Sequence, residues 1–334
     1  MNVKHSPILE GAYRFSVAPM MDCTDRHFRV LMRHITKRAL LYSEMIVAKS
    51  LHYSLNRKKL LDFNEIEHPI ALQIGGDDPK LLSEATRMAE AWGYDEINLN
   101  IGCPSSKVKA GEFGACLMAN PQKVARCIEA MVNSSKLPVT IKHRIGIDNL
   151  DSDDFLLSFI DEVANAGAQR FSIHARKALL NGLNPKENRT IPPLDYEKVK
   201  RIKKKRSNLI IELNGGLTNT EECLKALEDF DGVMVGRAVY DNPIVWNDID
   251  SVFYGEKKLN INQSSIFQQL IPYAENHLKD NGKLWEICRH TLKLIKGIPR
   301  AKVLRHELSL NAQKSNADIN LLEKVAQQLK DAGL

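Results

Sequence analysis

Eight short β-rich runs, each followed by a turn signal, constrain the fold of this 334-residue chain more than any other feature. They are "RFSVAPM" (14–20), "ALLYSEM" (39–45), "PIALQIG" (69–75), "DEINLNIG" (95–102), "PVTIKHRIG" (138–146), "RFSIHAR" (170–176), "NLIIELNGG" (208–216) and "DGVMVGRA" (231–238). Helical patterns separate these runs along the chain. This count and alternation predict a (β/α)₈ barrel, with parallel strands joined by right-handed crossovers.

The helices between the runs have readable ends. Asp78 is expected to cap a helix that has Pro79 at its first position and stops at Gly93, and Asn120 and Ser152 are expected to cap two later helices. The apolar face expected for the 79–92 helix consists of Leu81, Ala85, Met88 and Trp92.

The pattern changes after Gly255. The segments "SSIFQQLIPYAENHLKD", "KLWEICRHTLKLIKGI" and "NLLEKVAQQLKDAGL" predict amphipathic helices with no strands between them. We therefore expect a barrel domain over residues 1–255 and a small helical domain over residues 260–334. From Lys257 onward there are 13 Lys and Arg against 7 Asp and Glu, so this segment alone accounts for the net charge of +6. A basic helical domain beside a neutral barrel favours a polyanionic partner.

Several classes of protein are excluded by what the chain lacks. It has no apolar run long enough to span a membrane. Its first 15 residues have neither the apolar h-region nor the small-residue cleavage site of a signal peptide, so none is expected. Its six cysteines form no C-x-x-C pair, which argues against a zinc or iron–sulfur site and for a cytoplasmic location. No metal site is expected. The absence of G-x-G-x-x-G leaves a Rossmann dinucleotide site unsupported.

Polar or flexible residues follow nearly every predicted strand. They are Ala18, Pro19, Met20, Glu44, Gln73, Asn100, Cys103, Lys142, His174, Asn214, Gly215, Gly216, Gly236 and Arg237. Because the carboxyl ends of barrel strands converge on one mouth, these residues predict an active site there. "NGG" and "GR" end the last two strands, where barrels commonly bind phosphate through backbone N–H groups and arginine.

The basic run "KRIKKKR" (200–206) is not assigned to this site. We expect it to lie at the C-terminal end of a helix, where cations complement the helix dipole and remain solvated.

The motifs "SVAPMMDCTD", "PIALQIGGDDP", "INLNIGCPS", "VTIKHRIG", "SIHARKALLNGLNPKENRTIPPL", "ELNGG" and "VMVGRA" closely resemble those of the tRNA-dihydrouridine synthases, and "HARK" with "GLNPKENR" resembles the DusA branch. The resemblance covers most of residues 14–245. It implies an FMN-bound TIM barrel with a helical tRNA-binding domain. Such an enzyme would use NADPH to reduce the uracil C5=C6 bond of D-loop uridines, at tRNA positions 20 and 20a in this branch.

The resemblance also implies roles for individual residues. FMN would contact Ala18, Pro19, Met20 and Gln73 around its ring, Lys142 and His174 beside it, and Asn214, Gly215, Gly216, Gly236 and Arg237 at its phosphate end. The residues implied for tRNA are Asn100, Lys186, Arg189, Lys302 and Arg305. No protein partner is implied.

Cys103 is the candidate catalytic residue. Reduction of the pyrimidine double bond requires a hydride at C6, which reduced FMN can deliver, and a proton at C5. A thiol with a pKa near ~8.5 is mostly protonated at neutral pH and can act as the general acid. We expect Gly102 and Pro104 to fix the loop that aims the thiol.

Three other interpretations stay open. Lys142 at a strand end is compatible with a Schiff-base aldolase acting on a phosphorylated substrate. The basic C-terminal segment alone is compatible with a non-catalytic RNA-binding module. Another FMN barrel, such as a dihydroorotate or dihydropyrimidine dehydrogenase, would have no use for that segment.

Overall fold

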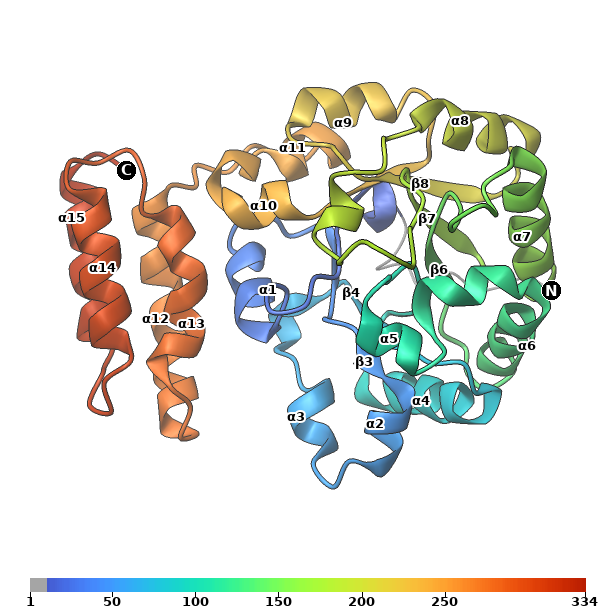
Figure 1. Cartoon of the computed structure of the whole chain (residues 1–334). Coiled ribbons are helices and arrows are strands. Elements are labelled where there is room, and N and C mark those ends of the chain that lie inside the picture. Colours follow the sequence, from blue (N-terminus) through green and yellow to red (C-terminus); the bar gives the residue numbers. More distant parts are fainter. Residues whose placement is uncertain (1–10) are drawn as a thin grey trace. The chain divides into compact units, whose positions relative to one another are not determined.

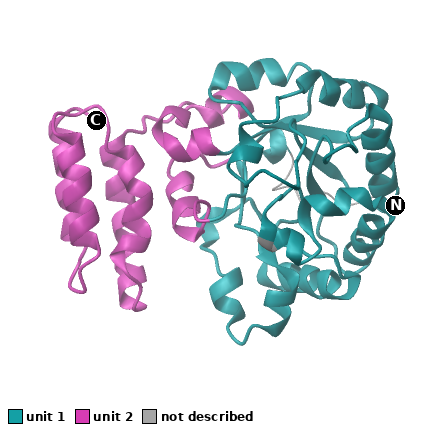
Figure 2. Ribbon diagram, viewed as in Figure 1, with its two compact units in different colours: residues 1–21, 39–236 teal, residues 22–38, 237–334 magenta. Residues whose placement is uncertain are grey.

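A computed structural model describes residues 11–334, which fall into two compact units (Figure 1, Figure 2). The first unit contains the described residues up to Met21 together with Ala39–Gly236. The second contains Asp22–Arg38 together with Arg237–Leu334. Residues 1–10, where the sequence predicts no signal peptide, lie outside the described residues.

The first unit is built on a parallel sheet. Its strands are β1 (Phe15–Val17), β2 (Leu40–Tyr42), β3 (Ile46–Val47), β4 (Ile70–Gly75), β5 (Glu96–Ile101), β6 (Val139–Arg144), β7 (Arg170–His174), β8 (Ile210–Asn214) and β9 (Gly232–Val235). β1 pairs with both β2 and β9, and β2 pairs with β4, so the sheet closes into a ring, while the short β3 only extends the edge of β4. Each run predicted from the sequence contains one strand of this ring, and the predicted (β/α)₈ barrel is confirmed.

Polar side chains line the inside of the barrel. Arg170 of β7 donates hydrogen bonds to Glu96 of β5 at 2.8 Å and to Glu212 of β8 at 3.0 Å, and both carboxylates are fully buried. Buried charges are tolerated when they are paired and hydrogen-bonded in this way. Because side chains alternate along a strand, Asn100 and His174 lie on the same inner face, four residues closer to the carboxyl ends. The ion pairs therefore fill the barrel interior one layer nearer to the amino ends of the strands than the residues that the sequence assigned to the site.

Helices connect the strands of the barrel. They are α2 (Ala48–Tyr53), α3 (Arg57–Leu61), α4 (Pro79–Trp92), α5 (Ser106–Ala110), α6 (Pro121–Val132), α7 (Asp153–Asn165), α8 (Tyr196–Lys205) and α9 (Thr220–Ala226), with 3₁₀ turns at Ala12–Arg14, Glu65–Glu67, Gly114–Ala119 and Glu187–Arg189. The predicted caps are confirmed, since the side chains of Asp78, Asn120 and Ser152 each accept a hydrogen bond from a backbone N–H in the first turn. Gly93 ends α4 with a left-handed φ of 88°.

The predicted apolar face of α4 is wrong. The buried residues of this helix are Leu82, Ala85, Thr86 and Ala89. Of the predicted stripe only Ala85 is among them, and Trp92 is 37% exposed. Small side chains at three of the four buried positions let α4 pack closely on β4 and β5, so contact with the sheet rather than the largest apolar residues decides the inward face.

The run 200–206 occupies the C-terminal part of α8, as predicted. Its cations pair with acidic side chains of the barrel exterior: Lys200 with Asp229, Arg201 with Asp153, Lys203 with Asp231 and Arg206 with Asp161. These pairs and the helix dipole account for the run without a nucleic-acid partner.

The second unit is helical throughout its described residues. It contains α1 (Arg26–Arg33), α10 (Arg237–Asp241), α11 (Ile249–Tyr254), α12 (Gln263–Lys279), α13 (Leu284–Thr291), α14 (Ala301–Ala312) and α15 (Asn320–Asp331), with 3₁₀ turns at Pro243–Trp246 and Leu292–Leu294. The helices predicted after residue 260 are present. The unit also takes in residues 22–38 and 237–259, so its limits do not coincide with the boundary expected at 255–260.

Residue contacts explain why the segment 22–38 belongs to the helical unit. Asp25 caps α1 by accepting a hydrogen bond from the Phe28 N–H at 3.0 Å, and it also pairs with Arg289 and His290 of α13. No helix within residues 11–334 has both the length and the apolar character that crossing a membrane requires.

Candidate functional site

Asn100 builds the loop that carries Cys103. Its side-chain oxygen accepts hydrogen bonds from the N–H groups of Gly102 and Cys103, both at 3.0 Å, and its amide donates to Gln73 of β4 at 2.9 Å. The Cys103 carbonyl accepts a further bond from the Ala115 N–H at 2.9 Å. The chain after β5 is therefore held by a side chain of that strand and by the following 3₁₀ turn.

Gly102 takes part in holding this loop through its backbone N–H and carbonyl, but the position does not require a glycine. A Cβ at this position would lie 3.5 Å from the Lys142 carbonyl oxygen, which is an ordinary van der Waals contact, and φ is not in the left-handed region. A glycine is required instead at Gly114, where φ is 73° and a Cβ would lie 2.7 Å from the Cys103 carbonyl oxygen.

Cys103 differs from the structural cysteines in its exposure. Its side chain is only partly buried, and its sulfur lies 3.6 Å from the Ser105 hydroxyl. Cys127, Cys223 and Cys288 are buried, and burial raises the pKa of each of these thiols to about 12. Cys103 is thus accessible at a strand end, whereas those three thiols are held neutral in the core.

Lys142 lies on β6 and is held by an amide. Its Nζ donates to Asn214 Oδ1 at 2.9 Å, and Asn214 donates in turn to the Met234 carbonyl at 2.8 Å. Burial, together with the charge of Arg144, lowers the pKa of Lys142 to about 8. The amine therefore loses its proton more readily than an exposed lysine, and Asn214 links it to the carboxyl ends of β8 and β9.

Gln73 is 1% exposed and fully engaged in the same layer. Its amide donates to Asn98 Oδ1 at 2.9 Å, while its oxygen accepts from Asn100. This chain of amides orients the polar end of Gln73 and the base of the Cys103 loop together.

The turn after β8 requires its two glycines. Gly215 and Gly216 have φ values of 107° and 79°. A Cβ on Gly215 would lie 2.5 Å from the His174 ring, and one on Gly216 would lie 2.4 Å from a methyl group of Leu194. The turn therefore packs directly against His174 of β7 and against Leu194, and side chains at these two positions would collide with them.

The ends of β1 and β9 lie side by side. A Cβ on Gly236 would lie 3.2 Å from the Met20 sulfur and 3.4 Å from the Ala18 Cβ. Pro19 lies between Ala18 and Met20 in the turn after β1, and Arg237 follows Gly236 as the first residue of α10. Apart from Arg237, which belongs to the second unit, the residues assigned to FMN from the sequence lie at the carboxyl ends of the barrel strands or in the next turn.

Arg144 is a site residue that the sequence analysis missed. Its guanidinium donates to the Gly102 carbonyl at 2.9 Å, the Asn188 carbonyl at 3.0 Å and the Lys177 carbonyl at 3.2 Å. It thereby ties the loop after β5 to the loop after β7. Burial is the main reason that the pKa of Arg144 is lowered to about 10. The sequence did contain a pattern that could have identified Arg144: it follows Lys142 by two positions, so both side chains lie on the same face of β6.

The residues assigned to tRNA fall in two places. Lys186 and Arg189 are exposed on the loop after β7, which is held by the buried Asn188 through hydrogen bonds with both backbone groups of Leu179. Lys302 is exposed on α14, whereas Arg305 is half-buried and donates to the Ile295 carbonyl at 2.6 Å.

The profile of the family described as "Dihydrouridine synthase (Dus)" matches residues 16–330 of this chain. The chain belongs to the dihydrouridine synthase family. Among curated proteins, the tRNA-dihydrouridine(20/20a) synthase of Synechocystis sp. is 50% identical over 96% of this chain and 95% of that protein. The proteins of the same name from Escherichia coli strain K12 and Shewanella oneidensis are each 46% identical over 95% of this chain, covering 92% and 94% of their own lengths.

Among solved structures, this dihydrouridine synthase is similar to an old yellow enzyme homologue from Zymomonas mobilis, with a TM-score of 0.53. The two are 12% identical, and the match covers 71% of this chain and 88% of the other. At that identity the likeness supports the barrel fold alone.

Proposed function

We propose that this chain is a tRNA-dihydrouridine(20/20a) synthase, which reduces the uracil C5=C6 bond of D-loop uridines at tRNA positions 20 and 20a. The observation that carries the proposal is the loop built by Asn100, which presents an accessible thiol at the barrel mouth in a chain 46–50% identical to synthases of that name.

The residues at the mouth fit FMN. Gly215 and Gly216 let the backbone turn after β8 without side chains of its own, and Lys142 and Arg144 donate to amide and carbonyl oxygens rather than to carboxylates. Such a surface suits an anionic cofactor. The residues proposed to hold FMN are Ala18, Pro19, Met20, Gln73, Lys142, His174, Asn214, Gly215, Gly216, Gly236 and Arg237. When bound and reduced by NADPH, FMN supplies the hydride for C6.

Cys103 is proposed to supply the proton for C5. Proton transfer from the thiol to carbon leaves a thiolate, which is stabilised by nearby positive charge. Lys142 and Arg144 are proposed to provide it, since Arg144 donates to the carbonyl of Gly102, the residue before Cys103, at 2.9 Å, and Lys142 lies two positions before Arg144 on β6. Asn100 fixes the backbone N–H of Cys103 and thereby aims the thiol.

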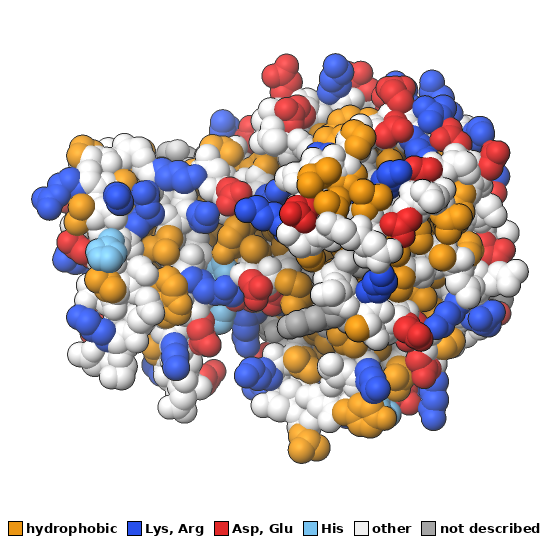
Figure 3. All heavy atoms as spheres, viewed as in Figure 1, with side chains coloured by type: hydrophobic (Ala, Val, Ile, Leu, Met, Phe, Trp, Pro, Cys, Tyr) orange, Lys and Arg blue, Asp and Glu red, His pale blue; other side chains and the backbone are white. Residues whose placement is uncertain are grey.

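tRNA is proposed to bind through basic side chains on both units. The net charge of +6 lies in the segment after residue 256, and Lys and Arg side chains are spread over the second unit in the space-filling view (Figure 3). Lys186, Arg189, Lys302 and Arg305 are the residues proposed to contact phosphates. A target uridine must leave its stack before it can reach the barrel mouth.

The test is Cys103→Ala in the full chain. We expect the purified variant to remain yellow and to oxidise NADPH, while dihydrouridine in tRNA, mapped by mass spectrometry, falls by at least about 100-fold. Cys116→Ala is the matched control, because Cys116 is also a partly buried cysteine of the following 3₁₀ turn. Normal dihydrouridine formation by Cys103→Ala, or a colourless wild-type protein that does not take up FMN, would refute the proposal.

A further inference from the structure

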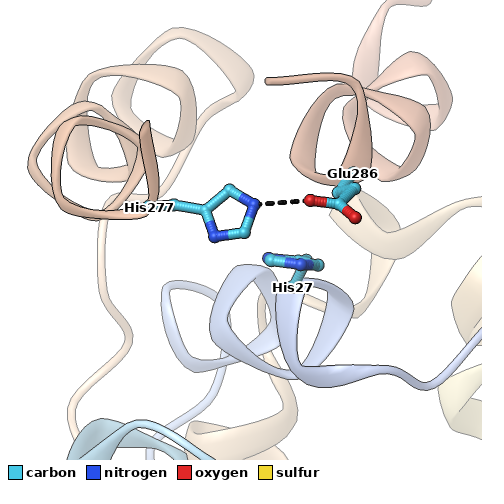
Figure 4. A group of neighbouring side chains, drawn as sticks. All are labelled: His27, His277 and Glu286. Atoms are coloured by element: carbon cyan, nitrogen blue, oxygen red, sulfur yellow. Dashed lines mark hydrogen bonds and ion pairs between the residues drawn. The ribbon is translucent and has the colours of Figure 1, made fainter. Parts of the chain in front are cut away.

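Three potential metal ligands from distant parts of the sequence meet within the second unit. They are His27 of α1, His277 of α12 and Glu286 of α13 (Figure 4). One ligand atom from each residue lies within 4.8 Å of those of the other two, and the two imidazole rings and the carboxylate converge on one point. None of these residues has a part in the proposed reaction.

Neighbouring groups orient each of the three side chains. The Tyr273 hydroxyl and His27 Nδ1 share a hydrogen bond at 2.9 Å, which leaves Nε2 as the nitrogen that a metal could take. Glu286 Oε2 accepts hydrogen bonds from His277 Nε2 at 2.8 Å and from the Lys283 N–H at 3.0 Å. Tyr273 and the Lys283 N–H are outer partners of the kind that fix the direction of metal-binding side chains. The hydrogen bond between His277 and Glu286 joins two of the ligands, and a bound ion would replace it.

The turn between α12 and α13 is shaped around the His277 ring. A Cβ on Gly282 would lie 2.2 Å from the His277 imidazole, so no larger residue could occupy this position without displacing the ring. The His27 and His277 rings are in edge-to-face contact, with centroids 4.6 Å apart. The position of the cluster is therefore set by packing on two sides.

We propose that His27, His277 and Glu286 bind one divalent transition-metal ion of the zinc class, which crosslinks α1 to α12 and α13. Two imidazoles and one carboxylate with an open fourth position form a known zinc ligand set. The open position would face solvent, because Glu286 is exposed. With ligand bonds of about 2.1 Å and tetrahedral angles, the ligand atoms must lie about 3.4 Å apart. Atoms that are now up to 4.8 Å apart must therefore close by about 1.4 Å, through rotation of the side chains on binding.

The ligand chemistry excludes the abundant hard cations. Magnesium and calcium prefer sites made of oxygen, whereas two imidazoles favour zinc, cobalt, nickel or copper. The role that follows is structural, since the segment 22–38 leaves the barrel sequence to join the C-terminal helices and the ion would fasten it there.

The experiment uses the full chain, freed of metal by a chelator and then titrated with Zn²⁺ against a chromophoric competitor. We expect one equivalent to bind, a thermal unfolding temperature that rises with Zn²⁺, and no effect of Mg²⁺. His277→Ala and Glu286→Gln should each weaken binding by at least about 100-fold, and Tyr273→Phe by about 10–100-fold. His306→Ala is the control, because His306 is exposed on α14 outside the cluster and should leave binding unchanged.

Zn²⁺ bound at cysteine residues elsewhere in the chain is the main alternative to the proposed site, and the absorption spectrum of the Co²⁺-substituted protein distinguishes the two. Nitrogen and oxygen ligands give visible bands without intense near-ultraviolet thiolate charge transfer, which is the expected spectrum. Strong thiolate bands, binding unaffected by His277→Ala, or a wild-type protein that binds no Zn²⁺ would overturn the proposal. Glu286→Gln guards against misfolding, because its amide oxygen can still accept the Lys283 N–H.

Discussion

At the scale of single residues, the barrel mouth depends on amides rather than on charges. Asn100 accepts from two backbone N–H groups, Asn214 holds Lys142, and Gln73 joins Asn98 to Asn100. Each of these groups is satisfied within the protein, which keeps their orientations fixed in a partly solvated mouth. Removal of one amide side chain should therefore change the positions of the residues at the barrel mouth and leave its net charge unchanged.

Asn100→Ala is expected to release the Cys103 loop. Two backbone N–H groups lose their acceptor, which should lower the free energy of unfolding by about 2 kcal/mol and nearly abolish dihydrouridine formation. Urea unfolding and product mapping in tRNA would measure both. Asn133→Ala removes an exposed C-cap residue of α6 and should affect neither. Full activity of Asn100→Ala would contradict the role assigned to its side chain.

Lys142→Met is expected to change how stability depends on pH. Burial lowers the pKa of Lys142 from 10.5 to about 8, so between these values the unfolded chain binds a proton that the folded protein has released. The free energy of unfolding of the wild type must therefore rise with pH across this window. The variant has no such proton, and its deficit relative to wild type should grow by about 2 kcal/mol between pH 7.5 and 9.5. Urea unfolding at the two pH values tests this, and parallel curves would count against it.

At the scale of elements, loops rather than strands carry the special backbone. The turn after β8 needs two left-handed glycines, and the 3₁₀ turn after α5 needs Gly114. Arg144 joins the loops after β5 and β7 through three carbonyls. The strands set the direction of the site side chains, whereas the loops provide the close backbone contacts and the hydrogen bonds between neighbouring loops.

Gly216→Ala is expected to reduce FMN binding. Its φ is 79° and its new Cβ would lie 2.4 Å from Leu194, so both the turn and its neighbours must shift. Gly182→Ala is matched in φ, at 84°, but its Cβ would meet nothing within 4 Å. Only the first variant should lose flavin absorbance per protein, while both lose about 1 kcal/mol of stability from backbone strain. Equal flavin content in the two variants would argue against a cofactor at this turn.

At the scale of the whole molecule, the location of charge matters more than its amount. The cations of 200–206 are largely paired with barrel acids, whereas the excess charge lies after residue 256. A polyanion should therefore bind to basic residues that have no acidic partner in preference to basic residues that are paired with carboxylates.

Binding of tRNA is expected to weaken steeply with salt, with a slope of log K on log salt set by the number of phosphates contacted. Lys186→Ala with Lys302→Ala should reduce the magnitude of that slope by about 2. Lys200→Ala with Arg201→Ala removes the same charge from paired cations of α8 and should leave the slope unchanged. Filter binding at several salt concentrations measures the difference, and equal effects of the two double variants would refute the assignment.

The sequence by itself determined the barrel, the helix caps at Asp78, Asn120 and Ser152, and the ring of polar strand ends. These follow from local spacing, because a cap bonds within one turn and parallel strands bring their carboxyl ends together. The helices after residue 260 were readable for the same reason. Local hydrogen bonding and periodicity were sufficient for all of them.

Only the tertiary structure decided which face of α4 is buried, that the Asn100 side chain holds the Cys103 loop, and that segment 22–38 joins the C-terminal helices. The tertiary structure alone also brings His27 close to His277 and Glu286. The cysteine spacing, which argued against a zinc site, carries no information about these three residues. The physical reason is that such pairings depend on how elements pack, and packing joins residues whose separation along the chain carries no periodic signal.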